Sequence, residues 1–308
     1  MIITGKYPSL RLRRNRKNDW CRRLVQENNL SSNDLILPIF LTEGINKKIS
    51  IKSMPGVNRY SINNLSSIID RAIKRKIPMI ALFPYTNPKV KDKVGSEALN
   101  EDNLVCQAIR YIKKKYRDEI GIMCDVALDP YTSHGHDGIL RKNKILNDET
   151  VDILVEQALL QAQMGCDVIA PSDMMDGRIK KIRRKLDKEN LQDVQILSYA
   201  VKYASNFYGP FRDAVGSNKA LKGNKKTYQM DYKNYNESLR EVSLDIKEGA
   251  DMVIVKPGMP YLDIIRGVKD NFKIPIIAYQ VSGEYSLIKY GIKNNINKRN
   301  TKRVFKYR

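Results

Sequence analysis

The segment GADMVIVKPGMPYLDI, Gly249–Ile264, contains the clearest strand pattern of the chain, and this strand ends on a lysine. The apolar run MVIV before Lys256 predicts a buried strand, and Pro-Gly directly after the lysine predicts a turn. Lys202 repeats the arrangement at the end of the preceding apolar run, QILSYAV. Chemistry in α/β barrels gathers at the carboxyl ends of strands, so both lysines are candidate functional residues.

Short apolar runs alternate with amphipathic stretches along most of the chain. The strand candidates are Ile36–Phe40, Met79–Pro84, Ile120–Leu128, Val168–Pro171, Gln195–Val201, Met252–Val255 and Ile274–Val281. Helical patterns at Ile62–Lys76, Glu149–Met164 and Ser238–Glu248 lie between some of them. Repeated strand–helix alternation predicts a parallel sheet, and seven strands over about 250 residues favour an α/β fold of the (β/α)8 barrel type. No G-x-G-x-x-G follows the first strand, which argues against dinucleotide binding.

The two ends of the chain depart from this pattern. Residues 1–30 are polar and basic, so we expect an N-terminal arm there and a barrel domain over residues 31–308. After Glu284 the sequence has no acidic residue, and the tail from Lys293 to Arg308 has neither strand nor helix periodicity. We therefore expect the eighth strand and its helix to be missing or divergent.

The chain is strongly basic, with 55 Lys and Arg against 34 Asp and Glu among 308 residues, a net charge of +21. Nucleic-acid binding is one interpretation. The basic residues are spread over the whole chain without an aromatic-interleaved pattern, so we favour biased composition with attraction for acidic substrates. No run of about 18 apolar residues and no signal-like apolar region is present, so no membrane partner is expected. Four scattered cysteines without a C-x-x-C pair favour the cytoplasm.

Polar side chains follow most predicted strands and would form a ring above an apolar barrel. They are Asp125, Asp129, His134, His136 and Asp137 after the third strand, Ser172, Asp173 and Asp176 after the fourth, Lys202 and Arg212 after the fifth, Lys256 after the sixth and Ser282 after the seventh. A lysine forms a Schiff base with a carbonyl compound only when its amine is unprotonated. Two lysines converging in an apolar pocket would each lower the other's pKa, which suits this chemistry.

Several segments carry a family resemblance. The chain resembles the 5-aminolevulinate dehydratases (porphobilinogen synthases) in LILPIF, MPGVNRYS, DVALDPYTSHGHDG, APSDMMDGRI, KYASNFYGPFRDA, TYQMD, EGADMVIVKPGMPYLDI and AYQVSGEY. These segments run in order from about Arg11 to about Tyr290. The resemblance implies a (β/α)8 barrel whose N-terminal arm makes oligomer contacts, usually in a homo-octamer. It also implies a lyase that condenses two molecules of 5-aminolevulinate to porphobilinogen, with loss of two waters, in haem and porphyrin biosynthesis.

The resemblance assigns roles residue by residue. It gives Lys256 and Lys202 as the Schiff-base lysines. Substrate contacts would come from Arg212, Lys225 and Gln229 on a mobile lid of about Phe207–Asp231, and from Ser282, Asp125 and Ser172. Cationic groups suit the carboxylate of a γ-keto acid, and amines suit its ketone.

Many family members hold a catalytic zinc with three cysteines in the third-strand segment, where this chain has Ala127, Asp129 and Asp137. Hard oxygen ligands suit Mg²⁺ or a monovalent cation, so the resemblance implies the zinc-independent, magnesium-type branch without catalytic zinc. Asp125, Asp129 and Asp137 could instead move protons or hold the substrate amine without a metal. Glu241 matches an allosteric Mg²⁺ site of bacterial relatives; its alternative is an ordinary solvated helix face.

The C-terminal departure leaves several functional interpretations open. The sequence no longer resembles the family after about Asn294, and relatives have a further strand with a tyrosine that assists the serine matched by Ser282. The chain is then an active enzyme with an unusual end, an inactive, decaying pseudoenzyme, or a truncated sequence. Two other classes also remain: a basic nucleic-acid-binding barrel, and an aldolase-type lyase with a single Schiff-base lysine.

Overall fold

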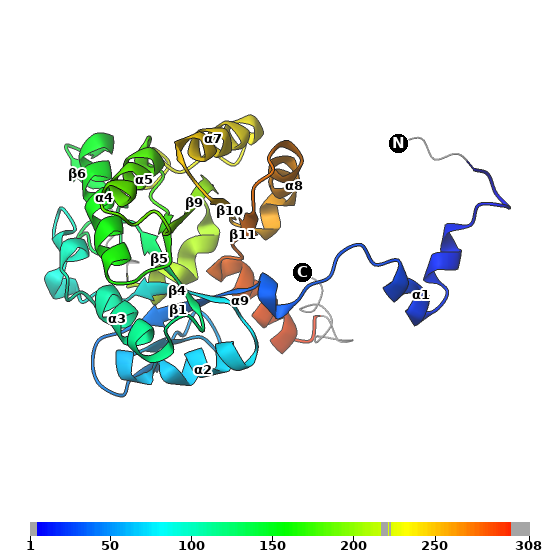
Figure 1. Cartoon of the computed structure of the whole chain (residues 1–308), viewed down its shortest axis with the longest axis horizontal. Coiled ribbons are helices and arrows are strands. Elements are labelled where there is room, and N and C mark those ends of the chain that lie inside the picture. Colours follow the sequence, from blue (N-terminus) through cyan, green and yellow to red (C-terminus); the bar gives the residue numbers. More distant parts are fainter. Residues whose placement is uncertain (1–4, 217–220, 222, 297–308) are drawn as a thin grey trace.

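A mostly parallel sheet forms the centre of the computed structural model, which describes residues 5–216, 221 and 223–296 (Figure 1). In these residues the sheet has nine strands in the order β11-β10-β9-β8-β5-β4-β1-β3-β2, and only β2 and β3 pair antiparallel. The strands are β1 Ile36–Leu41, β2 Lys48–Ser50, β3 Asn58–Tyr60, β4 Met79–Pro84, β5 Gly121–Val126, β8 Val168–Pro171, β9 Gln195–Lys202, β10 Met252–Lys256 and β11 Ile276–Ala278. A separate hairpin pairs β6 Ile139–Arg141 with β7 Lys144–Leu146.

The helices lie around these strands, except for α1, which lies in the N-terminal arm (Figure 1). They are α1 Asp19–Leu24, α2 Ser66–Lys74, α3 Leu104–Tyr116, α4 Asn147–Gln163, α5 Arg178–Lys188, α6 Gly209–Ala214, α7 Tyr235–Glu248, α8 Leu262–Asn271 and α9 Ser282–Lys293. The predicted α/β class with a mostly parallel sheet is confirmed. Strands β4 and β8 have the predicted limits, and β9 and β10 each extend by one residue to include their lysine.

Side chains of the central strands are buried on both faces of the sheet. In β4, Ile80 and Leu82 pack in the cluster between sheet and helices, while Ala81 and Phe83 pack in a second cluster on the opposite face. This alternation explains why the strands read as continuous apolar runs, as is usual for covered parallel sheets. No helix in the described part of the chain is both long and apolar enough to span a bilayer.

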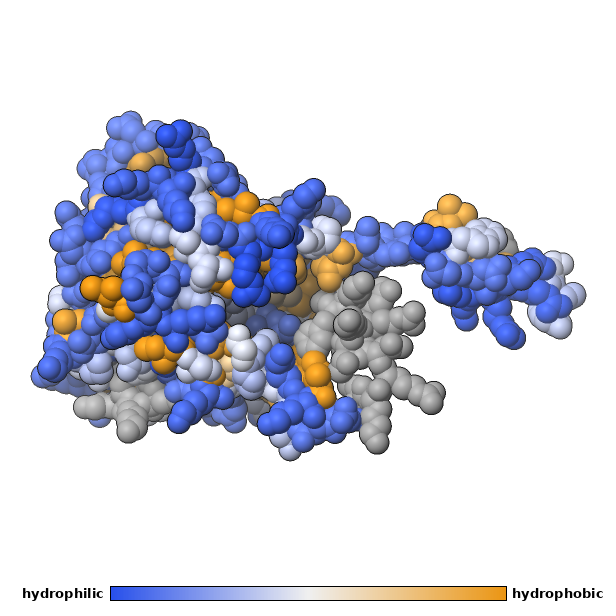
Figure 2. All heavy atoms as spheres, turned by 90° about the horizontal axis from the view of Figure 1, so that it is seen from below, coloured by the Kyte–Doolittle hydropathy of each residue, from blue (hydrophilic) through white to orange (hydrophobic). Residues whose placement is uncertain are grey.

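The N-terminal arm extends away from the sheet and its helices (Figures 1 and 2). From residue 5 to residue 30 every side chain is exposed except Cys21, which is half-buried, and the exposed set includes Trp20 at 58% and Leu24 at 77%. The arm therefore adds nothing to the core of this chain. At the other end, the predicted loss of an eighth strand concerns a tail of which residues 297–308 lie outside the described residues, so it stays a prediction.

Candidate active site

The two candidate lysines are direct neighbours across adjacent strands. Lys256 of β10 pairs with Lys202 of β9 at the carboxyl ends of both strands. The register shifts between the Val253–Ser198 and Val255–Val201 pairs, because β9 has one extra residue there. Without this bulge Lys256 would face Val201, so the irregularity brings the two amines to one face of the sheet.

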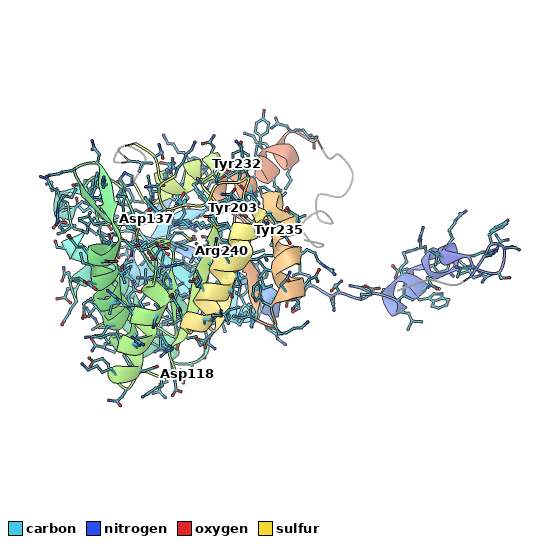
Figure 3. The ribbon with its side chains drawn as sticks, turned by 90° about the horizontal axis from the view of Figure 1, so that it is seen from above. Asp118, Asp137, Tyr203, Tyr232, Tyr235 and Arg240 are labelled. Carbon is cyan, nitrogen blue, oxygen red and sulfur yellow. The ribbon has the colours of Figure 1, made fainter. Side chains whose placement is uncertain are left out.

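The site lies at the carboxyl ends of the parallel strands, where the sequence analysis expected it. Figure 3 shows Asp137, which follows β5, inside the upper part of the body, and Asp118, which precedes β5, near its lower edge. The lysines end β9 and β10, so they share the end that holds Asp137. The carboxyl ends of the parallel strands therefore bring the predicted residues together.

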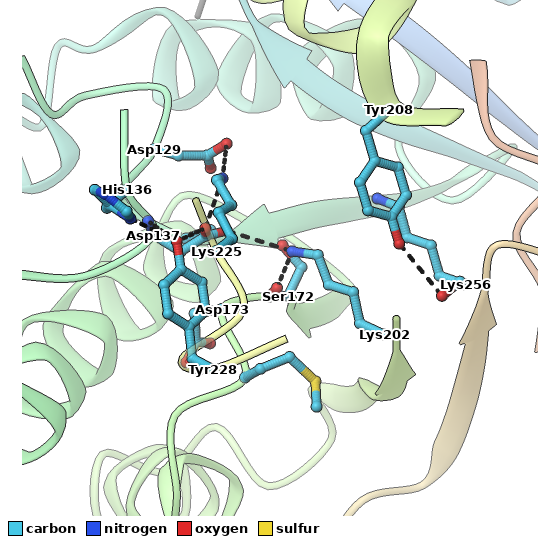
Figure 4. Close-up of polar contacts among 12 residues, drawn as sticks. Asp129, His136, Asp137, Ser172, Asp173, Lys202, Tyr208, Lys225, Tyr228 and Lys256 are labelled. Atoms are coloured by element: carbon cyan, nitrogen blue, oxygen red, sulfur yellow. Dashed lines mark hydrogen bonds and ion pairs between the residues drawn. The ribbon is translucent and has the colours of Figure 1, made fainter. Parts of the chain in front are cut away.

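Lys202 is buried and held by polar groups (Figure 4). Its Nζ donates to the carbonyl oxygen of Ser172 and lies 3.3 Å from Oδ1 of Asp137. Lys225 bridges the next two carboxylates, with Nζ 2.6 Å from Asp137 and 3.2 Å from Asp129. Four predicted residues and the backbone of a fifth thus form one connected network.

Opposite charges fix the ionisation of this network. Burial alone would raise the pKa of Asp137, but Lys202 and Lys225 together lower it well below its usual value. Burial lowers the pKa of Lys225, and Asp129 and Asp137 more than offset this, so its pKa is raised. Asp137 therefore stays a carboxylate and Lys225 stays an ammonium at neutral pH.

Lys256 has different surroundings. Burial, assisted by the nearby charge of Lys202, lowers its pKa to about 7. Burial also raises the pKa of Asp125 to about 6, although both lysines oppose this shift. A lysine that is half neutral near pH 7, close to a carboxyl group that titrates just below, can act as a nucleophile with an adjacent proton acceptor.

A cavity of about 1460 Å³ opens beside this network, and its lining includes Arg212, Lys225 and Gln229. Lys202 and Lys256 lie outside the lining, deeper in the protein. Ser282 is buried at the start of α9, where its hydroxyl accepts from the amide of Phe211 at 2.8 Å and donates to the carbonyl of Phe207 at 3.2 Å. The three predicted lid residues thus meet at the cavity, while Ser282 anchors the backbone at the base of that lid.

The predicted metal ligands do not form one cluster. Glu241 is half-buried on α7, where burial raises its pKa to about 7 against the effect of Arg178. Asp129 and Asp137 are engaged by lysines. Among residues 5–216, 221 and 223–296, no three His, Cys, Asp or Glu side chains are arranged to hold a metal ion.

Sequence reasoning missed three parts of the site. The hydroxyl of Tyr228 donates to Oδ2 of Asp137 at 2.8 Å, and burial lowers the pKa of Lys91, which lies near Asp129. Arg178 is fully buried between Asp173 and Asp245, 3.5 Å from each. Tyr228 lies inside TYQMD and Arg178 lies inside APSDMMDGRI, so both stood in segments singled out above, although neither was assigned a role; nothing in the sequence marks Lys91.

The fold is thus a mostly parallel α/β sheet with two buried lysines side by side at one end of it. The delta-aminolevulinic acid dehydratase family matches residues 9–305, and the chain belongs to this family. The match reaches into the tail that we expected to diverge. The chain is 63% identical over 280 residues to the delta-aminolevulinic acid dehydratase of Bradyrhizobium diazoefficiens, covering 91% of this chain and 79% of the relative.

Other relatives agree. The Rhodobacter capsulatus delta-aminolevulinic acid dehydratase is 50% identical over 297 residues, covering 95% of this chain and 88% of the relative. A crystal structure of the Toxoplasma gondii enzyme in complex with the reaction product porphobilinogen superposes with a TM-score of 0.93 at 43% identity, covering 96% of this chain and 84% of that one. These comparisons support an active enzyme and give no support to the pseudoenzyme alternative.

Proposed function

We propose that this chain is a porphobilinogen synthase, which condenses two molecules of 5-aminolevulinate with loss of two waters through Schiff bases on Lys202 and Lys256. The observation that carries the proposal is the direct pairing of these lysines at the carboxyl ends of β9 and β10. The lowered pKa of Lys256, about 7, supports its role as the more reactive amine. An aldolase-type lyase needs only one such lysine and leaves the second unexplained.

Each step can be assigned to groups of this chain. Each lysine amine adds to the ketone of one substrate, and loss of the ketone oxygen as water leaves an imine. Removal of a proton next to the Lys256 imine gives an enamine, which attacks the carbon of the Lys202 imine. Expulsion of Lys202, addition of the free substrate amine to the Lys256 imine carbon, expulsion of Lys256 and loss of a proton give the pyrrole. Asp125 is half-buried, lies close enough to both lysines for their charges to act on it, and is suited to move these protons.

The remaining residues would bind the substrates. Arg212, Lys225 and Gln229 line the cavity and offer donors for a carboxylate. Lys225 already contacts Asp129 and Asp137, so a substrate carboxylate would share or replace these contacts when the lid closes. Ser172 presents its carbonyl to Lys202, and Ser282 would bind the second carboxylate only if it releases a backbone contact.

We also propose the magnesium-type branch of the family, with no catalytic zinc. Ala127, Asp129 and Asp137 stand where zinc-dependent relatives have three cysteines, and both aspartates contact lysines, which favours proton transfer and amine binding over metal binding there. Glu241 fits an allosteric Mg²⁺ better. It offers one half-buried carboxylate with Asp245, Asp176 and Glu237 adding negative charge, and Mg²⁺ is commonly held by one or two carboxylates and water.

Three further features complete the proposal. The exposed apolar side chains that the arm has between residues 5 and 30 would be covered in a homo-octamer. The parallel sheet would form part of a (β/α)8 barrel within residues 31–308. Four free cysteines suit the reducing cytoplasm.

The test is porphobilinogen formation from 5-aminolevulinate by the purified chain, with Mg²⁺, with EDTA and with a zinc chelator. We expect turnover that survives the zinc chelator. Light scattering, as a readout independent of activity, should show an Mg²⁺-dependent larger assembly that Glu241→Ala loses. If the folded chain forms no porphobilinogen, the proposed activity is refuted. Tight nucleic-acid binding that weakens steeply with salt would support the basic-protein alternative instead.

A further inference from the structure

Four aromatic rings surround the amine of Lys256. Its Nζ lies 4.4 Å from the ring centre of Tyr279, 5.0 Å from Tyr199, 5.2 Å from Phe211 and 5.5 Å from Tyr208. The rings come from separate parts of the chain: β9, the turn Asn206–Tyr208, α6 and the segment after β11. Lys202, the paired lysine, contacts a carboxylate and a carbonyl instead.

The three tyrosines contact the amine through their rings. The hydroxyl of Tyr208 donates to the backbone carbonyls of Tyr203 at 2.6 Å and Lys256 at 3.3 Å. The hydroxyl of Tyr199 is buried and has no hydrogen-bond partner in the described residues. Ring faces attract cations, most strongly where water is excluded.

We propose that these four rings form an aromatic cage that favours the iminium cation of Lys256 over its ammonium form. The inference rests on the proposed function and extends it to four residues to which the family resemblance assigned no role. When the neutral amine adds to a ketone, the C=O bond is replaced by a C=N bond and the oxygen leaves as water. The reaction takes up one proton, so the nitrogen of the product carries a positive charge. The cage would stabilise this product.

The preference follows from the different hydration of the two cations. An ammonium group is a compact, strongly hydrated charge with three N–H donors. Ring faces cannot replace the water that these donors lose on burial. An iminium spreads its charge over nitrogen and carbon, keeps one N–H donor and carries apolar substituents, so the rings compensate it better. The cage thus assists both loss of the proton and formation of the imine.

The discriminating experiment separates ring faces from plain apolar packing. Tyr279→Leu keeps an apolar wall without a ring, and Tyr279→Phe is the conservative replacement. Borohydride trapping with 5-aminolevulinate, followed by mass spectrometry of the Lys256 peptide, measures imine formation. We expect Tyr279→Leu to need roughly tenfold more substrate for half-maximal trapping, and Tyr279→Phe to restore most of this loss. The pH midpoint of trapping should not rise in the leucine variant, since the amine stays buried.

Phe211→Leu, on a different element, repeats the test if a Tyr279 variant does not fold, and Tyr111→Leu on α3 controls for loss of a ring elsewhere. Equal trapping by the Leu and Phe variants would overturn the cage, as would a pH midpoint that moves toward the ordinary lysine value, which indicates entry of water. Failure of the wild-type chain to label Lys256 at all would refute the proposed function itself, so the two failures are distinguishable.

Discussion

The two lysines of the site end adjacent strands at the same register, yet the protein holds them in opposite ways. Lys202 contacts the carboxylate of Asp137 and a carbonyl oxygen, within a network that continues to Lys225. Lys256 is enclosed by aromatic rings, and burial lowers its pKa to about 7. Position on the strand therefore gives both amines access to the site, but tertiary surroundings decide the reactivity of each.

This contrast suggests a division of labour. Burial and the charge of Lys202 lower the pKa of Lys256 to about 7, which suits a nucleophile near neutral pH. The polar side keeps Asp137 ionised between two cations and so holds Lys202 and Lys225 in place. Such separated environments are a common way to give like groups different roles in one site.

The largest expected effect is from Lys256→Ala. Loss of the reactive amine should reduce porphobilinogen formation by at least about 1000-fold, because the covalent route through this imine is removed. Lys180→Ala, an exposed change on α5, is the matched control. Steady-state kinetics measures the effect, and borohydride should still label the Lys202 peptide. Turnover close to the wild-type rate would show that the reaction does not need an imine on Lys256.

On the polar side, Asp137→Asn should reduce kcat/KM on the order of 100-fold, because two buried ammonium groups lose the carboxylate they share. Asp129→Asn should cost less, since Asp129 contacts only Lys225 of the two lysines. The comparison of both variants with wild type, together with thermal unfolding to check the fold, tests the network. Equal losses from both would mean that contact with Lys202 contributes nothing.

Much of this architecture was predictable from sequence. Strands β4 and β8 were predicted with the right limits, because continuous apolar runs bounded by turn residues mark buried parallel strands. Both lysines were found because each directly ends such a run. The three-residue strands β2, β3, β6 and β7 were missed, since so few residues show no periodicity.

What sequence could not show was how separate segments meet. The bulge that pairs Lys256 with Lys202 is a register shift between two strands, and neither strand reveals it alone. The rings around Lys256 lie up to 80 positions apart, Tyr199 to Tyr279, and look like ordinary core residues. Arg178 precedes the basic run KKIRRK, whose expected solvated face gave no sign that this arginine is fully buried between two aspartates.

The pH dependence should distinguish the two sides. Lys256 must be neutral to attack, so imine formation should rise with pH through about 7 and level off above it. Below pH 7 the rate of imine formation should fall about tenfold with each pH unit, and protonation of Asp125, whose pKa is about 6, should make this fall steeper. Trapping on the Lys256 peptide at a series of pH values measures it. In Lys202→Met the pH midpoint of Lys256 trapping should move upward, because a neighbouring positive charge is gone. An unchanged midpoint would mean that the charge of Lys202 does not affect Lys256.

The smallest effect expected is from Tyr228→Phe, which keeps the ring and removes the hydroxyl that donates to Asp137 at 2.8 Å. One hydrogen bond to a charged group contributes about 1.5–3 kcal/mol, but Lys202 and Lys225 still hold this carboxylate, so we expect a loss of roughly three- to tenfold in kcat/KM. Tyr111→Phe, which removes a hydroxyl contact to Ser66 on the helices outside the site, controls for general effects. Labelling of Lys256 should keep its wild-type pH midpoint, because Tyr228 belongs to the polar side alone. A shift in that midpoint would show that the two sides act as one network, and the contrast between them would then describe contacts rather than function.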